Sequence, residues 1–325
     1  AEVDTNGSNL AATLENGQPI PIDNVSCDPV ARTMQVWVQW PNVSSLSGVP
    51  IYLQATSGAV ANDPSCWTNA GYDRVYSMDD TSGPIVDRSG NADAALVNGP
   101  TLGVDGQIGK GVDFEQSLNQ RLTATDPRGV SFTVSGWFIW RSNNANAQQG
   151  MITWVSDNGI LSGILRNMNA VGDPLQVNVD RGDGEVNYYF GPSFRSPDFG
   201  VPYHVAASYS FGSVPQLYVN GNLQTISYGG SFPASTSPTL YISEYNYLGG
   251  GRTFDGIIDQ VQHAPAAKSA AWIQYEYANQ STATGTMGTV IEDGGDRAVA
   301  TRVRGRYRHG RYRGRHIKGA SQAFA

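Results

Sequence analysis

Few side chains in this 325-residue chain are spaced for acid–base or nucleophilic catalysis. Glycoside hydrolysis needs two carboxylates on either side of the scissile bond. The nearest approach to such a pair is Asp113 and Glu115, two acids on either side of Phe114, and this spacing is more typical of a solvated strand end. The four His and two Cys residues lack the spacing of metal ligands or of a nucleophilic triad. We therefore expect no enzymatic activity.

One loop has residues that could bind a cation. Asp87, Asn91 and Asp93 alternate with small residues. Their side-chain oxygens and the neighbouring carbonyls could converge on a hard cation such as Ca²⁺, which takes about six to eight oxygen ligands. The alternative is a loop that satisfies its own backbone through Asx turns.

The C-terminal segment is the most basic part of the chain. From Arg297 onward there are eight Arg, one Lys and no acid, whereas residues 1–296 hold 12 basic and 28 acidic residues, a net charge of −16. Two mirrored Arg-rich runs flank His309-Gly310 and could form a hairpin, in which facing arginines repel unless an anion lies between them. The arginines expected to bind that anion are Arg304, Arg306, Arg308, Arg311, Arg313 and Arg315.

Three interpretations of this basic tail are open: two partners that would supply an anion, and no partner. We expect the acidic surface of a neighbouring subunit in a homo-oligomer, or of another virion protein, to bind it. Nucleic acid is the second candidate, because arginine-rich segments order on binding it. An unbound, solvated extension is the third.

The remaining composition favours β-structure. The chain has 38 Gly, 17 Pro and only 15% charged residues, with 16 Tyr, 10 Phe and 7 Trp, which excludes a helical bundle and a disordered chain. No run approaches 18 apolar residues, so no membrane insertion is expected, and residues 1–9 lack the features of a signal peptide. Cys27 and Cys66 could form a disulfide or stay as two buried thiols.

Short alternating runs bounded by turn residues predict an all-β sandwich or barrel. The clearest predicted strands are residues 35–40, 132–140, 205–209, 216–220 and 239–243. Asn220-Gly221 predicts a type I′ hairpin over residues 217–226, since both central positions need a positive φ. Residues 266–278 follow Pro265 and predict a short helix.

Several motifs in chain order carry a family resemblance. Residues 75–83 and 86–100 (VDRSGNADAALVNGP), followed by residues 106–114 and by Phe-Asp-Gly-Ile-Ile-Asp-Gln-Val at 254–261, resemble laminin-G-like, concanavalin-A-like jelly-roll domains. The resemblance implies an antiparallel jelly-roll sandwich over residues 71–280. Arg88 and Gln260 depart from the family pattern, which usually has Ser and Glu at these positions.

The flanking segments complete the predicted domain organisation. Residues 1–70 resemble part of an uncharacterised β module that is common in secreted bacterial and phage tail proteins. Residues 281–325 are read as a linker and the basic tail.

The resemblance also implies two sites. A structural Ca²⁺ often lies near the acidic loop in this family, and Asp259 of the terminal strand would then join Asp87, Asn91 and Asp93, although Gln260 removes a charge. On jelly rolls, exposed aromatics serve as platforms for sugars, and Tyr245, Tyr247 and Arg252 in a Gly-rich loop fit that role. A second aromatic cluster comprises Tyr188, Tyr189 and Phe190. The alternative is that these aromatics pack in the core or against another subunit.

We therefore predict a non-enzymatic structural or adhesive protein of a virion or cell surface, hence extracellular, whose jelly roll binds a glycan. The alternative is a secreted, lectin-like carbohydrate-binding module. A polysaccharide-active enzyme is the weakest hypothesis.

Overall fold

A computed structural model gives the fold of the chain as two compact units. The larger is Gly71–Ser281, and the described part of the smaller lies within Ala1–Ala70. The residues that the structure describes are 8–14, 16–28, 33–38, 51–127, 129–141, 148–155, 161–167, 175–180, 185–190, 198–232, 239–245 and 252–281.

The smaller unit is a β-structure with its own core. Antiparallel strands β1 (Leu10–Leu14), β2 (Pro19–Ile20) and β5 (Ile51–Ala55) form one sheet in the order β2-β1-β5. Strands β3 (Ile22–Asp28) and β4 (Thr33–Val38) form a hairpin, and α1 (Ser65–Thr68) follows β5. The indole of Trp67 donates a 2.8 Å hydrogen bond to the buried carboxylate of Asp23. This bond fixes α1 to the hairpin.

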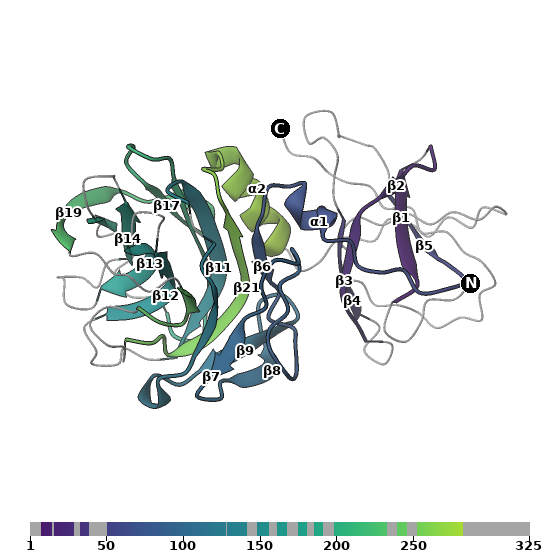
Figure 1. The fold of residues 1–325 in the computed structure, drawn as a ribbon, viewed down its shortest axis with the longest axis horizontal. Coiled ribbons are helices and arrows are strands. Elements are labelled where there is room, and N and C mark those ends of the chain that lie inside the picture. The colour runs from purple at the N-terminus through teal and green to yellow at the C-terminus, as the bar shows by residue number, and fades with distance from the viewer. Residues whose placement is uncertain are drawn as a thin grey trace. The chain divides into compact units, whose positions relative to one another are not determined.

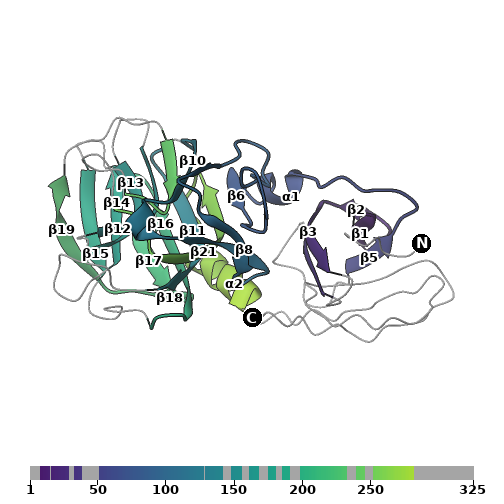
Figure 2. The ribbon, with the colours of Figure 1, turned by 90° about the horizontal axis from the view of Figure 1, so that it is seen from below.

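The larger unit consists of two antiparallel sheets (Figures 1 and 2). The first, here the β14 sheet, has the order β19-β15-β14-β13-β12-β20-β10-β7. Its strands are β7 (Ala95–Val97), β10 (Arg121–Thr125), β12 (Gln148–Val155), β13 (Leu161–Asn167), β14 (Leu175–Asp180), β15 (Glu185–Phe190), β19 (Ile226–Phe232) and β20 (Thr239–Ile242).

The second sheet, here the β11 sheet, has the order β18-β17-β16-β11-β21-β9-β8, with β6 also paired to β21. Its strands are β6 (Arg74–Tyr76), β8 (Thr101–Asp105), β9 (Lys110–Phe114), β11 (Phe132–Trp140), β16 (Pro202–Tyr209), β17 (Gln216–Val219), β18 (Asn222–Leu223) and β21 (Gly256–Ala264). A short 3₁₀ helix, Gln116–Leu118, follows β9. The predicted all-β antiparallel sandwich is confirmed.

Alternation along the strands builds the core between the sheets. In β11, Val134 and Phe138 join the main hydrophobic cluster, whereas Ser135 and Trp137 face outward. Side chains of successive strand residues point to opposite faces, so the outer face holds the intervening residues.

The predicted hairpin and helix are both present. Asn220 and Gly221 have φ values of 50° and 73°, as the type I′ turn between β17 and β18 requires. Helix α2 (Ala270–Ser281) begins later than predicted. Ser269 caps it by accepting a hydrogen bond from the Trp272 N–H at 3.2 Å. The preceding residues 265–269 are not helical, and there the Lys268 N–H donates to Thr133 Oγ1 at 2.7 Å.

Candidate functional site: an open groove on the β14 sheet

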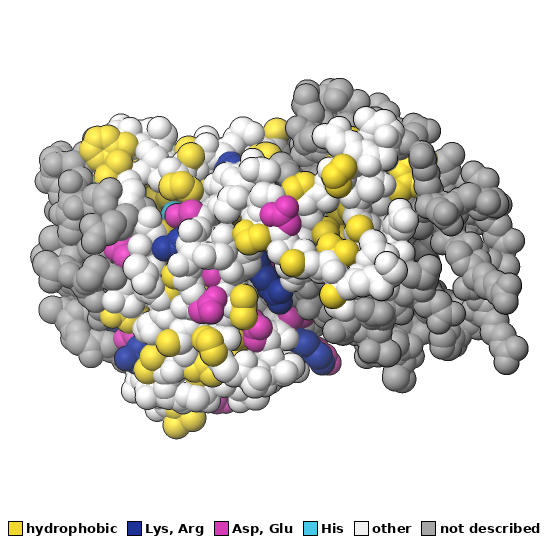
Figure 3. All heavy atoms as spheres, turned by 45° about the vertical axis from the view of Figure 1, so that its right-hand side comes forward, with side chains coloured by type: hydrophobic (Ala, Val, Ile, Leu, Met, Phe, Trp, Pro, Cys, Tyr) yellow, Lys and Arg dark blue, Asp and Glu magenta, His cyan; other side chains and the backbone are white. Residues whose placement is uncertain are grey.

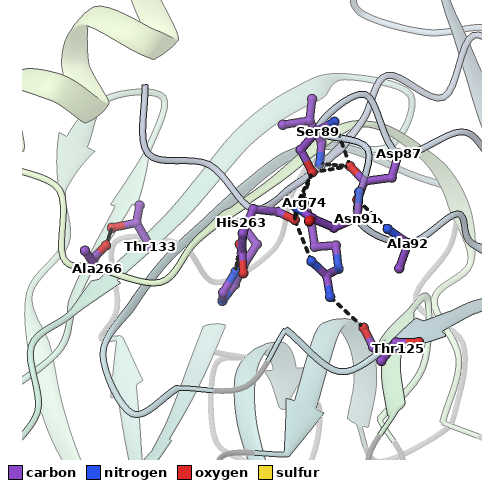
Figure 4. Close-up of polar contacts among 11 residues, drawn as sticks. Arg74, Asp87, Ser89, Asn91, Ala92, Thr125, Thr133, His263 and Ala266 are labelled. Atoms are coloured by element: carbon purple, nitrogen blue, oxygen red, sulfur yellow. Dashed lines mark hydrogen bonds and ion pairs between the residues drawn. The ribbon is translucent and has the colours of Figure 1, made fainter. Parts of the chain in front are cut away.

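The predicted cation loop is held by its first acid. Asp87 is buried, and both carboxylate oxygens are engaged (Figure 4). Oδ1 accepts hydrogen bonds from the Val75 N–H at 2.9 Å, the Ser89 N–H at 2.9 Å and the Ser89 hydroxyl at 2.7 Å. Oδ2 accepts from the N–H groups of Asn91 at 3.2 Å and Ala92 at 2.9 Å. A carboxylate has about four lone-pair positions, so Asp87 is fully used by the loop and strand β6.

The backbone of Asp73 anchors the same loop. Its carbonyl accepts hydrogen bonds from the Ser89 hydroxyl at 2.9 Å, the Asn91 amide at 3.0 Å and the Arg74 guanidinium at 2.6 Å. Its carboxylate lies 2.6 Å from Nδ1 of the buried His263. Figure 4 shows these side chains converging from β6, β21 and the loop.

Asp259 lies at a different place from this loop. Its Oδ2 accepts the Ile108 N–H at 2.7 Å beside Gly106. Burial raises the pKa of Asp259 well above its ordinary value; the backbone N–H of Ile108 opposes this, and the neighbouring carboxylate that adds to it is Asp79.

The predicted calcium ligands are therefore not gathered into one cluster. Among the described residues, no group of three or more His, Cys, Asp or Glu side chains is placed to hold a metal ion. Both carboxylate oxygens of Asp87 already accept hydrogen bonds from the protein, so this donor set does not fit Ca²⁺. The geometry agrees with the Asx-turn alternative.

Asp93 is the loop residue that reaches a surface feature. Its Oδ1 accepts the Asp87 N–H at 2.9 Å, and the side chain borders an open, shallow groove of about 360 Å³. The other lining residues are Thr123, Ala124, Thr125 and Thr239.

Strand register explains why threonines line this groove. Leu122 and Leu240 face the core. Because neighbours along a strand face opposite ways, the intervening Thr123, Thr125 and Thr239 face outward. Thr125 pairs directly with Thr239, and Thr123 pairs with Tyr241. The structure thus places a row of hydroxyls beside one carboxylate on an exposed part of the β14 sheet.

A neutralised ion pair ends this row. Arg121 lies two residues before Thr123 on the same face, and its Nε is 2.7 Å from Oε2 of Glu244. The backbone of Thr125 is held by Arg74, whose Nη2 donates to its carbonyl at 3.4 Å (Figure 4). The sequence showed the alternation in residues 121–125, but the outward threonines alone gave no signal that they border a groove.

The predicted aromatic platform is wrong for Tyr245. This side chain is fully buried, and the Arg252 guanidinium lies 5.6 Å from its ring centroid. The guanidinium also donates to Gln148 Oε1. Gly150 explains the burial, because a Cβ there would lie 1.9 Å from the Glu244 carbonyl carbon. The segment entering Tyr245 therefore presses directly onto the backbone of β12.

The remaining predicted residues are placed as follows. Tyr188 belongs to the core, so the packing alternative holds for it. Cys66 is buried in α1. Outside the described side chains lie Tyr247, Tyr189, Phe190, Cys27 and the six tail arginines Arg304, Arg306, Arg308, Arg311, Arg313 and Arg315.

A Ser, a His and a Glu do meet, but under helix α2. Glu276 Oε1 accepts the Ser135 hydroxyl at 2.5 Å and lies 3.1 Å from His204 Nε2, while Oε2 accepts the Tyr72 hydroxyl at 2.6 Å. A nucleophilic triad needs the His between the Ser and the acid, whereas here the acid is in the middle and all these groups are buried. Trp137 adds a 2.7 Å bond to Gln280. This network attaches α2 to the outer face of the β11 sheet.

Asp113 and Glu115, the nearest approach to a catalytic carboxylate pair in the sequence, both make a structural contact. Both pair with Arg141, which lies 2.8 Å from Glu115 Oε1 and 3.1 Å from Asp255 Oδ1. The guanidinium therefore ties the ends of β9, β11 and β21 together.

Comparison with family models finds a match within the larger unit. Residues 114–274 match the family model of the concanavalin A-like lectin/glucanases superfamily. This confirms the jelly-roll resemblance read from the sequence. A search of curated proteins found no match.

Three solved structures resemble this chain, and the first of them supports the fold. A crystal structure of an HCR/D mutant is 15% identical with a TM-score of 0.50, over 68% of this chain and 55% of that one. The receptor-binding domain of botulinum neurotoxin mosaic serotype C/D is 14% identical with a TM-score of 0.49, over 68% and 53%. Domain 4 of an extracellular arabinanase from Geobacillus stearothermophilus, in complex with arabinotriose, is 16% identical with a TM-score of 0.48, over 63% and 97%. This chain thus spans about half the length of the first two, and identities this low establish the fold alone.

Proposed function

We propose that the larger unit is a non-enzymatic carbohydrate-binding module, and that the sugar lies in the groove between Asp93 and the threonines of β10 and β20. The supporting observation is the open row of Thr hydroxyls beside a carboxylate, on a concanavalin A-like sandwich. Hydroxyls donate and accept hydrogen bonds, and a carboxylate accepts them, so together they match the hydroxyl groups of a sugar. The hydroxyls of Thr123 and Thr125 are not used in any described protein contact.

A glycan array with the purified full chain tests this proposal. We expect binding by the wild type and a loss of about tenfold or more in affinity for the Thr123→Val/Thr125→Val variant, because two hydrogen bonds are removed at nearly constant shape. Thr101→Val is the matched control, since Thr101 is an exposed strand threonine in the other sheet. Unimpaired binding by the double variant would contradict the groove as the site.

The surrounding protein is proposed to be an adhesive protein of a virion or cell surface. An open groove gives weak affinity per site, and many copies in one assembly raise the avidity without new contacts. The basic tail supplies a means of assembly, because the remaining chain has a net charge of −16. In the described residues, no helix is long and apolar enough to cross a membrane.

Deleting residues 297–325 separates this proposal from the two alternatives. We expect the intact chain to form oligomers that weaken with salt and the truncated chain to be monomeric by light scattering. A monomeric intact chain that still binds glycans would favour a secreted lectin-like module. Release of reducing ends from a bound polysaccharide would favour an enzyme.

A further inference from the structure

The groove has an uncompensated negative charge at its rim. One oxygen of Asp93 accepts the Asp87 N–H, and the other accepts no hydrogen bond from a described residue. The side chain is exposed and borders the groove. The three other side chains that offer polar atoms are neutral threonines, so the groove lining itself has a net charge of −1.

The nearby cations do not cancel this charge. Arg121 is on the same face but is paired with Glu244 at 2.7 Å. Arg74 is buried and directs its guanidinium to the backbone carbonyls of Asp73 and Thr125 rather than into the groove. On the face shown in Figure 3, acidic and basic side chains are interspersed, so no broad field of one sign dominates that surface.

The buried side chain of Tyr76 lies close to this loop and to Asp93. The Tyr76 hydroxyl donates to the Ala92 carbonyl at 2.8 Å. Burial is the main reason that its pKa is raised far above the ordinary value, and Asp87, Asp93 and Asp73 raise it further while Arg74 alone opposes them. Asp93 is thus one of the carboxylates close enough to act on this phenol.

From this arrangement we infer that the groove selects amine-bearing and neutral sugars and rejects acidic ones. The inference rests on the proposed carbohydrate function. An ammonium group on a hexosamine has three donors, and the free oxygen of Asp93 and the hydroxyls of Thr123 and Thr125 are all acceptors. A uronate or sialate carboxylate would face Asp93 in a groove whose lining holds no cation, and like charges in contact are unfavourable.

The test compares binding of the full chain to immobilised neutral, de-N-acetylated and acidic oligosaccharides at pH 7. The Asp93→Asn variant keeps an oxygen that can accept the Asp87 N–H but removes the charge. Asp105→Asn is the control, because Asp105 is an exposed acid on β8 paired with Lys110, and its loss changes the net charge equally.

We expect Asp93→Asn to lower the affinity for de-N-acetylated sugars about tenfold, to raise that for acidic sugars several-fold, and to change that for neutral sugars less than threefold. Asp105→Asn should leave all three unchanged. Wild-type binding of acidic sugars as tight as that of neutral ones, or affinities for amine-bearing and acidic sugars that do not change in Asp93→Asn, overturns the selectivity while the carbohydrate function stands. Binding of no sugar by the wild type overturns the carbohydrate function, and the selectivity with it.

Discussion

Two outward-facing surfaces of the sandwich both present polar residues, but one is covered by a helix and the other is open. On the β11 sheet, Ser135 and His204 face outward and are covered by α2, where Glu276 binds both. On the β14 sheet, Thr123 and Thr125 face outward and border an open groove. Polar residues on a strand therefore stabilise the fold where an element covers them, and they are available to a ligand where none does.

The largest expected effect is at the covered surface. Glu276→Leu keeps the volume but leaves three buried polar groups without their acceptor, so we expect the free energy of unfolding to fall by about 3 to 5 kcal/mol. Gln274→Leu, on the exposed side of the same helix, should change it by less than about 0.5 kcal/mol. Urea denaturation measures both. A loss below about 1 kcal/mol for Glu276→Leu would show that the network does not hold α2.

The acidic loop contains both kinds of residue within residues 87–93: Asp87 is buried in hydrogen bonds, and Asp93 is exposed at the groove. Asp87→Ala leaves backbone N–H groups without their acceptor and should cost about 2 to 3 kcal/mol. Asp93→Ala removes one hydrogen bond at an exposed position and should cost less than about 1 kcal/mol. Equal losses in thermal unfolding would contradict the division between a structural and a ligand-facing acid.

The features that could be predicted from the sequence depend on neighbouring residues, whereas those that could not depend on contacts between residues far apart in the chain. Asn220-Gly221 and the strand at residues 132–140 were predicted because turn chemistry and alternation are local. The burial of Tyr245 depends on Gly150, far away in the chain, and the start of α2 depends on Thr133. The groove arises from the pairing of Thr125 with Thr239. Neither long-range contact nor strand pairing is visible in a single stretch of sequence.

A pH titration sharpens the account of the covered surface. Burial acts to raise the pKa of Glu276, but His204 and the hydroxyls of Ser135 and Tyr72 lower it below its ordinary value of 4.5. A carboxylate with a lowered folded pKa stabilises the fold above the unfolded value and loses that contribution as the pH falls through the folded one. Burial, with Glu276, raises the pKa of Tyr72 above its ordinary 10.0, so stability should also fall as the pH rises beyond that value.

The measurement is the difference in unfolding free energy between the wild type and Glu276→Gln. We expect it to shrink as the pH falls below about 4.5, since the glutamine does not titrate. A difference that stays constant down to pH 3 would mean that the Glu276 carboxylate gains nothing from its partners.

The smallest expected effect is that of metal removal. An ion bound only to the folded state would stabilise it by about 2.7 kcal/mol at a hundredfold excess over its dissociation constant. The oxygens of Asp87 already accept five hydrogen bonds from within the protein, and Asp259 neighbours Asp79 rather than the loop. We therefore expect the same melting temperature in Ca²⁺ and in EDTA. A rise with Ca²⁺ that Asp87→Asn abolishes would restore the loop as a calcium site. A rise abolished only by Asp259→Asn would place the ion near Asp79, and would leave the loop with its structural role and the groove with Asp93 as its acid.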